Sequence, residues 1–118
     1  MPQSKHGRLN EDMKRMVVAI IGEMKDPRVQ GFLTVTRVEV TQDLSSAKVH
    51  VSVLDGPRSA EATAEAVAAL KRAAGHIRGE VSRRMHIRKA PEFIFLADGG
   101  AAYAAHINEM IEELKDNE

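Results

Sequence analysis

The spacing of apolar residues changes its period along this chain, and these changes restrict the folds that it can adopt. Over residues 7–25 apolar side chains recur every three to four positions, as on one face of an α-helix: Leu9, Met13, Met16, Val17, Ile20 and Met24. The period shortens to two over residues 32–41 and 47–53, which are rich in β-branched residues and are predicted to be strands. Only a short turn around Asp43 separates them, so we expect an antiparallel hairpin.

A helical period returns after the turn at Asp55-Gly56-Pro57, and Ser59 is the expected N-cap of the helix that follows. The apolar positions then keep one helical phase through Gly75: Ala66, Val67, Leu70, Ala74, Ile77 and Val81. This periodicity leaves one long helix and two shorter helices equally open, and Gly75, a weak helix former, marks where a bend would fall. The stretch ends before Ala90-Pro91, because a residue that precedes proline is pushed out of the helical conformation.

Residues 93–96 are apolar on both faces and predict a third strand, and residues 101–115 predict a C-terminal helix. The resulting order is helix, strand, strand, helix, helix, strand and a last helix, which predicts a two-layer α+β sandwich. A type II KH-like domain, a fold that grips single-stranded nucleic acid, has this order of elements. We therefore expect residues 1–118 to form a single KH-like RNA-binding domain.

The residue types exclude several kinds of site. The chain has no cysteine and therefore no disulfide or thiolate metal site, and His76 and His86 lack the spacing of metal ligands. It contains neither a phosphate-binding Gly-x-x-x-x-Gly-Lys loop nor a recognisable nucleophile with its base. No apolar run approaches the roughly 20 residues that span a bilayer, and the N-terminus is too polar for a signal peptide. We expect a cytoplasmic, non-catalytic protein without a metal or cofactor.

Charge is unevenly distributed, although the formal net charge is zero. Between residues 71 and 89 the only acid is Glu80, and acidic residues collect instead towards the C-terminus. The basic residues of this segment are Lys71, Arg72, Arg78, Arg83, Arg84, Arg88 and Lys89. Such a segment attracts nucleic acid even on a neutral protein, whereas a solvated helical face would carry the same charges without a function. Charge alone leaves both interpretations open.

Five short motifs occur in a characteristic order along the chain. They are Asp26-Pro27-Arg28, Val35-Thr36-x-Val38-x-Val40, Ala47-x-Val49-x-Val51-Ser52-Val53, Ala73-Ala74-Gly75-x-Ile77-Arg78 and Pro91-Glu92-Phe93-x-Phe95-x-x-Asp98. Together they resemble the ribosome-binding factor A family over about residues 8–114. The resemblance implies a KH-like fold and a monomer that binds 16S rRNA of the free small (30S) ribosomal subunit during late maturation and rRNA processing. It also implies release by a GTPase and importance for growth in the cold.

Two departures from expected patterns bear on the site. An ordinary KH domain clamps the RNA backbone with a Gly-x-x-Gly loop, where this chain has Ala73-Ala74-Gly75-His76. Loss of the first glycine should turn an open loop into a bent, interrupted helix whose basic edge meets the RNA. The C-terminus is acidic, whereas many members of the family end in a longer basic tail, so a function owed to such a tail is not expected here.

The candidate rRNA-binding residues all belong to the helix pair and the loop after it. They are Lys71, Arg72, Ala73, Gly75, His76, Arg78, Arg83, Arg84, Arg88 and Lys89. Among them Arg84 falls close to the apolar stripe and is the weakest candidate. The three phenylalanines, Phe32, Phe93 and Phe95, are expected in the core, so stacking on aromatic rings should contribute little.

Other interpretations remain open from the residues. Asp26-Pro27-Arg28 is better explained as a helix stop, with Arg28 pairing with Asp26, than as an RNA contact. The whole chain could instead be a protein-interaction module that docks through its charged poles or through the exposed alanines Ala64 and Ala68, or a general KH-type RNA binder.

Overall fold

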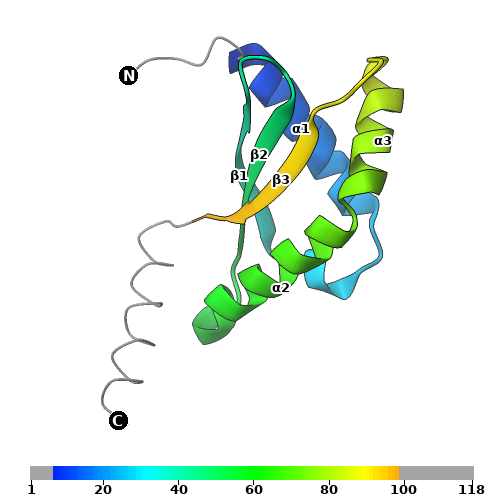
Figure 1. The fold of residues 1–118 in the computed structure, drawn as a ribbon. Helices are drawn as coiled ribbons and strands as arrows, with labels where there is room; N and C mark the ends of the chain where they lie inside the picture. The colour runs from blue at the N-terminus through cyan, green and yellow to red at the C-terminus, as the bar shows by residue number, and fades with distance from the viewer. Residues whose placement is uncertain (1–6, 99–118) are drawn as a thin grey trace.

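The computed structural model describes residues 7–98, and its elements follow the predicted order (Figure 1). Helix α1 (Gly7–Glu23) and a 3-10 turn, η1 (Pro27–Val29), precede the hairpin of β1 (Leu33–Val40) and β2 (Ser46–Val53). A second 3-10 turn, η2 (Gly56–Arg58), leads into α2 (Ser59–Arg72), α3 (Ala74–Met85) and β3 (Glu92–Ala97). The helix predicted over residues 101–115 lies outside the described residues.

The strands form a mixed sheet in the order β1-β2-β3. Strands β1 and β2 pair antiparallel, with Leu33 opposite Val53 and Val40 opposite Ala47, as the short turn between them predicts. Strand β3 pairs parallel to β2, so the chain must cross from one end of the sheet to the other, and α2 and α3 make that crossover. This arrangement is the predicted two-layer α+β sandwich of KH-like order.

All three helices pack against one face of the sheet, and none of the elements within residues 7–98 covers the opposite face. Along β2 the buried residues alternate with residues that are exposed or half-buried, as in a strand with one covered face. The most completely buried large side chains are Met13, Val17 and Ile20 of α1, Val49 and Val51 of β2, Leu70 of α2, Ile77 and Val81 of α3 and Phe95 of β3. Each such side chain stabilises the fold by about 1.5–3 kcal/mol relative to its exposed state.

A β-bulge in β1 resets the alternation of buried residues. The register with β2 shifts between Val35 and Arg37, and the extra residue, Thr36, donates a hydrogen bond from its hydroxyl to the carbonyl oxygen of His50 at 3.1 Å. Val35 and Val38, three positions apart, therefore both face the core. An unbroken strand would have turned one of them to solvent.

Phe32 is not in the core, contrary to the expectation from sequence. Its side chain is 75% exposed, whereas Phe93 and Phe95 are buried with ring centroids 6.5 Å apart. Gly31, whose φ is +80°, turns the chain immediately before β1. Phe32 shares the outward phase of Thr34, because Val35 points inward on the same strand.

The prediction that Ser59 is the N-cap of α2 is also wrong. Arg58 occupies the N-cap position, and the hydroxyl of Ser59 instead accepts the N–H of Asp55 and donates to the carbonyl of Gly56, both at 2.8 Å. The N-terminal turn of α2 is tied to the sheet by Thr63. Its fully buried hydroxyl accepts the N–H of Val53 at 2.9 Å and donates to the carbonyl of Ser59 at 2.7 Å.

The helix pair is interrupted, as the loss of the first glycine predicts, but the break lies at Ala73 and not at Gly75. Ala73 has φ −91° and ψ 2°, and its N–H bonds to the carbonyl oxygens of Ala69, Leu70 and Lys71 together. Gly75 lies in the first turn of α3 without a positive φ. Leu70 and Ile77, on the two sides of this one-residue break, are both fully buried.

Candidate nucleic-acid interface

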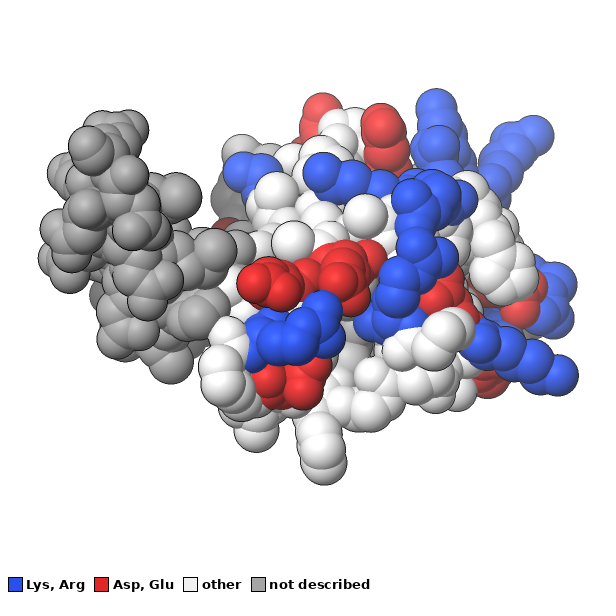
Figure 2. All heavy atoms as spheres, turned by 90° about the horizontal axis from the view of Figure 1, so that it is seen from below, with Lys and Arg blue, Asp and Glu red and all other residues white. Residues whose placement is uncertain are grey.

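The candidate residues lie on the last turn of α2, on α3 and in the loop that joins α3 to β3. Figure 2 views the molecule from the α2 end and shows basic side chains gathered on the right half of that face, with acidic side chains among them. This is the side on which α2 runs into α3 in Figure 1. The pairing of each charge decides which residues of the basic segment are available to a ligand.

Four of the predicted cations are exposed and form no ion pair with the residues that the structure describes. Lys71 and Arg72 end α2, and Arg88 and Lys89 follow α3. At the junction between α2 and α3, Ala73 offers no side chain that could cap α3, so the positive end of the helix dipole lies beside Lys71 and Arg72. An anion such as a phosphate group is favoured at this place. We call these four residues the unpaired cations.

Arg83 and Arg84 are engaged within the protein. Nη2 of Arg83 lies 2.8 Å from Oε1 of Glu80, and Arg84 bonds both to Oε1 of Glu80 at 2.9 Å and to Oε2 of Glu23 at 2.8 Å. Hydrogen bonds from Arg84 lower the pKa of Glu23, and hydrogen bonds from Arg83, then Arg84, lower the pKa of Glu80. Arg84 is half-buried, as its position near the apolar stripe predicts, and it joins α3 to the end of α1.

Arg78 organises the loop that carries two of the unpaired cations. Its Nε donates to the carbonyl oxygen of Ala90 at 3.0 Å, and the N–H of Ala90 donates to the hydroxyl of Ser82 at 3.1 Å. His86 ends α3 in the left-handed conformation, with φ 54°, and its N–H bonds to the carbonyl of Ser82. These contacts hold Arg88 and Lys89 close to α3 instead of leaving them on a free loop.

The Asp26-Pro27-Arg28 turn adjoins this surface, a proximity that the sequence pattern did not predict. Nη2 of Arg28 lies 2.7 Å from Oδ2 of Asp26, so the predicted pairing is confirmed, and α1 has ended by Glu23. Hydrogen bonds from the side chain and then the backbone N–H of Arg28 lower the pKa of Asp26 to about 2, and the charge of Arg72 adds to the effect. Arg72 therefore lies near the turn, although 44 positions separate them in the sequence.

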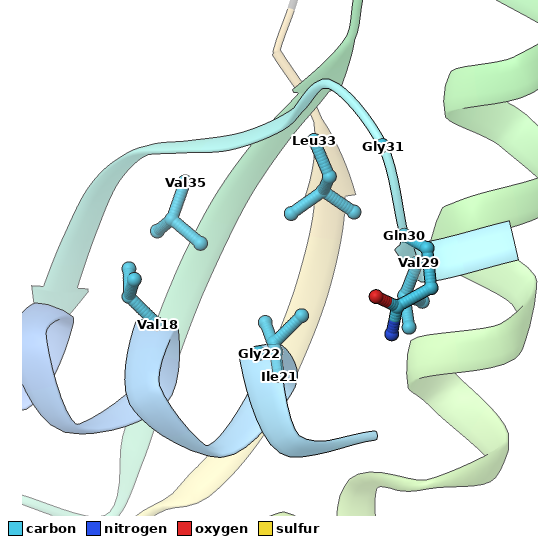
Figure 3. A pocket seen from close by; sticks show the side chains of 8 residues that line it. All are labelled: Val18, Ile21, Gly22, Val29, Gln30, Gly31, Leu33 and Val35. Atoms are coloured by element: carbon cyan, nitrogen blue, oxygen red, sulfur yellow. The ribbon is translucent and has the colours of Figure 1, made fainter. Parts of the chain in front are cut away.

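Two hollows in the surface differ in chemistry. One, of about 180 Å³, lies between α1 and β1; Figure 3 shows Val18 and Ile21 facing Leu33 and Val35 across it, with Gln30 at its end. Its aliphatic walls suit no phosphate. The other, of about 620 Å³, lies between the β1–β2 turn and the α3–β3 loop and includes Arg78 and Lys89. Only the second hollow continues the basic side of the molecule.

Residues 7–98 contain no cluster of three His, Asp or Glu side chains that could hold a metal ion, and none of the helices they form is long and apolar enough to cross a membrane.

Known proteins resemble this chain over most of its length. A model of the family described as "Ribosome-binding factor A" matches residues 5–111. A ribosome-binding factor A from Desulfitobacterium hafniense (strain DCB-2) is 42% identical over 119 residues, which cover 100% of this chain and 92% of that protein. The crystal structure of ribosome-binding factor A from Thermus thermophilus superposes with a TM-score of 0.66 at 31% identity, covering 76% of this chain and 91% of that one. Coordinates of the Thermus thermophilus factor fitted into the cryo-EM map of its 30S complex match with a TM-score of 0.61 at 27% identity, covering 79% and 94%.

Proposed function

Because this chain belongs to the ribosome-binding factor A family, we propose that it binds the free small (30S) ribosomal subunit through 16S rRNA and catalyses no reaction. The observation that carries the proposal is the group of unpaired cations, of which Lys71 and Arg72 lie beside the uncapped start of α3 and Arg88 and Lys89 follow its end. A surface of this kind binds phosphates without reading bases. That suits a factor that recognises the shape of a folded rRNA.

The candidate residues differ in how readily they could contact a phosphate, because some already form ion pairs within the protein. Lys71, Arg72, Arg88 and Lys89 form no ion pair within residues 7–98, although Arg72 lies near Asp26, and Arg78 uses only its Nε. Ala73, Gly75 and His76 form the surface between them. We assign Arg83 and Arg84 a secondary role, because a phosphate would have to compete with Glu80 and Glu23 for them.

We further propose that binding occurs during late subunit maturation and rRNA processing in the cytoplasm, that a GTPase releases the factor, and that growth in the cold depends on it. These steps follow from membership of the family. The unpaired cations support only the binding step, because contacts made mainly through charge form quickly and weaken as the salt concentration rises.

The measurement is co-sedimentation of the protein with free small subunits, free large subunits and assembled ribosomes. We expect binding to the free small subunit and little to the other two particles. If about four to five phosphates are neutralised, log affinity should fall with log salt at a slope of roughly −3, since each single-strand contact contributes about −0.7. Equal binding to all three particles, or an affinity that salt does not change, would contradict the proposal.

A matched pair of variants locates the contact. Lys89→Glu reverses an unpaired cation of the candidate interface, whereas Lys48→Glu reverses a lysine on the open face of the sheet. Both side chains are exposed, so both variants should fold; Lys48→Glu, which comes opposite Glu39 of β1, should cost no more than about 1 kcal/mol of stability. We expect Lys89→Glu to weaken subunit binding and Lys48→Glu to leave it nearly unchanged; the reverse pattern would move the interface to the sheet.

A protein-interaction module is the second candidate, favoured by one observation. Phe32 and Leu54 are 75% and 70% exposed and adjacent, since the N–H of Leu54 donates to the carbonyl of Phe32 at 3.2 Å. Such an apolar pair suits a protein partner. Loss of subunit binding in Phe32→Ser, with Lys89→Glu unaffected, would favour this candidate.

A further inference from the structure

The hollow between the β1–β2 turn and the α3–β3 loop has walls of opposite charge. Its volume of about 620 Å³ falls within the range of about 300–1,000 Å³ that is usual for small-ligand sites. Lys89 and Arg78 line it from the helical side, and Asp43 and Glu92 line it from the sheet. Leu44, Ser45 and Ala90 complete the lining.

The helical wall presents hydrogen-bond donors. Arg78 is held in place by the bond from its Nε to the Ala90 carbonyl at 3.0 Å, and its two Nη groups make no hydrogen bond with the described residues. Lys89 is exposed and likewise forms no ion pair within residues 7–98. An anchored guanidinium beside a free ammonium group is a good site for a phosphate.

The opposite wall is a rigid turn. Oδ1 of Asp43 accepts hydrogen bonds from the hydroxyl of Thr41 at 2.8 Å, from the N–H of Ser45 at 3.1 Å and from the hydroxyl of Ser45 at 2.7 Å. These bonds, those of Ser45 first, lower the pKa of Asp43 to about 2, so its carboxylate is charged at neutral pH. The turn is therefore fixed before any ligand arrives.

Leu44, at the tip of this turn, contributes little to the fold itself. Its φ of 64° is in the left-handed region, which is unfavourable for a bulky side chain, and it is 48% exposed. A glycine would adopt this backbone without strain. The leucine instead adds an apolar surface to the lining of the hollow, and unfavourable backbone conformations of this kind concentrate at binding sites.

We propose that this hollow holds one unpaired nucleotide of the bound RNA. The phosphate lies against Arg78 and Lys89, the base packs on Leu44, and Glu92 accepts a hydrogen bond from an exocyclic amino group of the base. Glu92 fits this role because it lines the hollow, is exposed and forms no ion pair within residues 7–98. Adenine, cytosine and guanine carry such a group and uracil does not, so the site disfavours uridine.

This inference rests on the proposed function and adds a nucleotide site to it. The test uses the full chain, labelled single-stranded octamers rA8, rC8 and rU8, and free small subunits. We expect rA8 and rC8 to bind at least about threefold more tightly than rU8. In Glu92→Gln, whose amide both donates and accepts, that preference should shrink.

Leu44→Gly separates a binding role from a structural one. We expect it to weaken binding of rA8 and of the subunit by about fivefold through loss of an apolar contact with the base. The same change should leave the melting temperature unchanged or raised, because glycine relieves the unfavourable φ. The control is Leu54→Ala, which removes an exposed leucine at the opposite end of the hairpin and should not change RNA binding.

Unchanged RNA and subunit binding in Leu44→Gly, or equal affinity of the wild type for rA8, rC8 and rU8, would overturn the nucleotide site. The proposed function would survive either result as long as the wild-type protein still co-sediments with the small subunit. Failure of the wild-type protein to co-sediment with the small subunit would instead overturn the proposed function.

Discussion

Substitution of Gly75 by alanine should make the protein more stable and a weaker binder at the same time. Gly75 lies in the first turn of α3, its φ is not positive, and a methyl group added there would meet no atom within 4 Å. Alanine is favoured over glycine in helices by about 0.5–1 kcal/mol. For a domain of this size that gain raises the melting temperature by about 2–8 °C.

Subunit binding should fall in the same variant, because Gly75 is exposed between Arg72 and Arg78. We place the RNA backbone against this point, where the lack of a side chain permits a close approach. A methyl group there would hold the RNA away from the neighbouring cations. We expect a loss of about tenfold in affinity, equivalent to about 1.4 kcal/mol.

The assay measures thermal melts by circular dichroism and subunit affinity by sedimentation on the same preparation. Gly79→Ala is the matched control, since Gly79 is also helical, exposed and free of atoms within 4 Å of an added Cβ. It should raise the melting temperature similarly with a smaller effect on binding. A lowered melting temperature for Gly75→Ala would contradict the helical backbone at Gly75. A raised melting temperature with unchanged subunit binding would refute a close approach of RNA to Gly75.

Four further substitutions test the fold. His86→Gly should raise the free energy of unfolding by about 0.5–1 kcal/mol in a denaturant titration, because glycine adopts the φ of 54° without strain. Thr63→Val should cost about 1–3 kcal/mol in the same titration, because the N–H of Val53 loses its partner. Asp26 and Asp43 have pKa values of about 2 against ordinary values of 3.8, so their stabilisation is present above about pH 4 and lost as pH falls towards 2. In Asp26→Asn and Asp43→Asn, the free energy of unfolding should depend less on pH over that interval.

The order of elements could be predicted because each segment carries a clear period. The four apolar positions Met13, Val17, Ile20 and Phe95 all reach the core that their spacing predicts. The bulge at Thr36 was not predicted, although the three-residue step from Val35 to Val38 is a visible signal of it. Periodicity also could not place the break between α2 and α3, since a one-residue interruption preserves the apolar phase on both sides.

The sequence shows which residues of the candidate site are basic, but it could not predict which of these charges pair with acids. A count of charges treats Arg83 and Lys89 alike, but Arg83 is paired with Glu80 on the same helix and Lys89 has no such partner within residues 7–98. The link from Arg84 to Glu23 spans 61 positions, so no local pattern could have revealed it. The nearness of Arg72 to the Asp26 turn depends in the same way on tertiary packing.

The central claim is that rRNA contacts the unpaired cations, which lie at the α2–α3 junction and after the end of α3. Because the chain has no cysteine, one introduced thiol can carry an iron chelate that cleaves nearby RNA with hydroxyl radicals. His76→Cys places the probe on the candidate interface, and Thr34→Cys places it on the open face of the sheet; both positions are exposed. We expect cleavage of 16S rRNA in the bound small subunit from position 76 and little from position 34. Strong cleavage from position 34 with none from position 76 would contradict the claim.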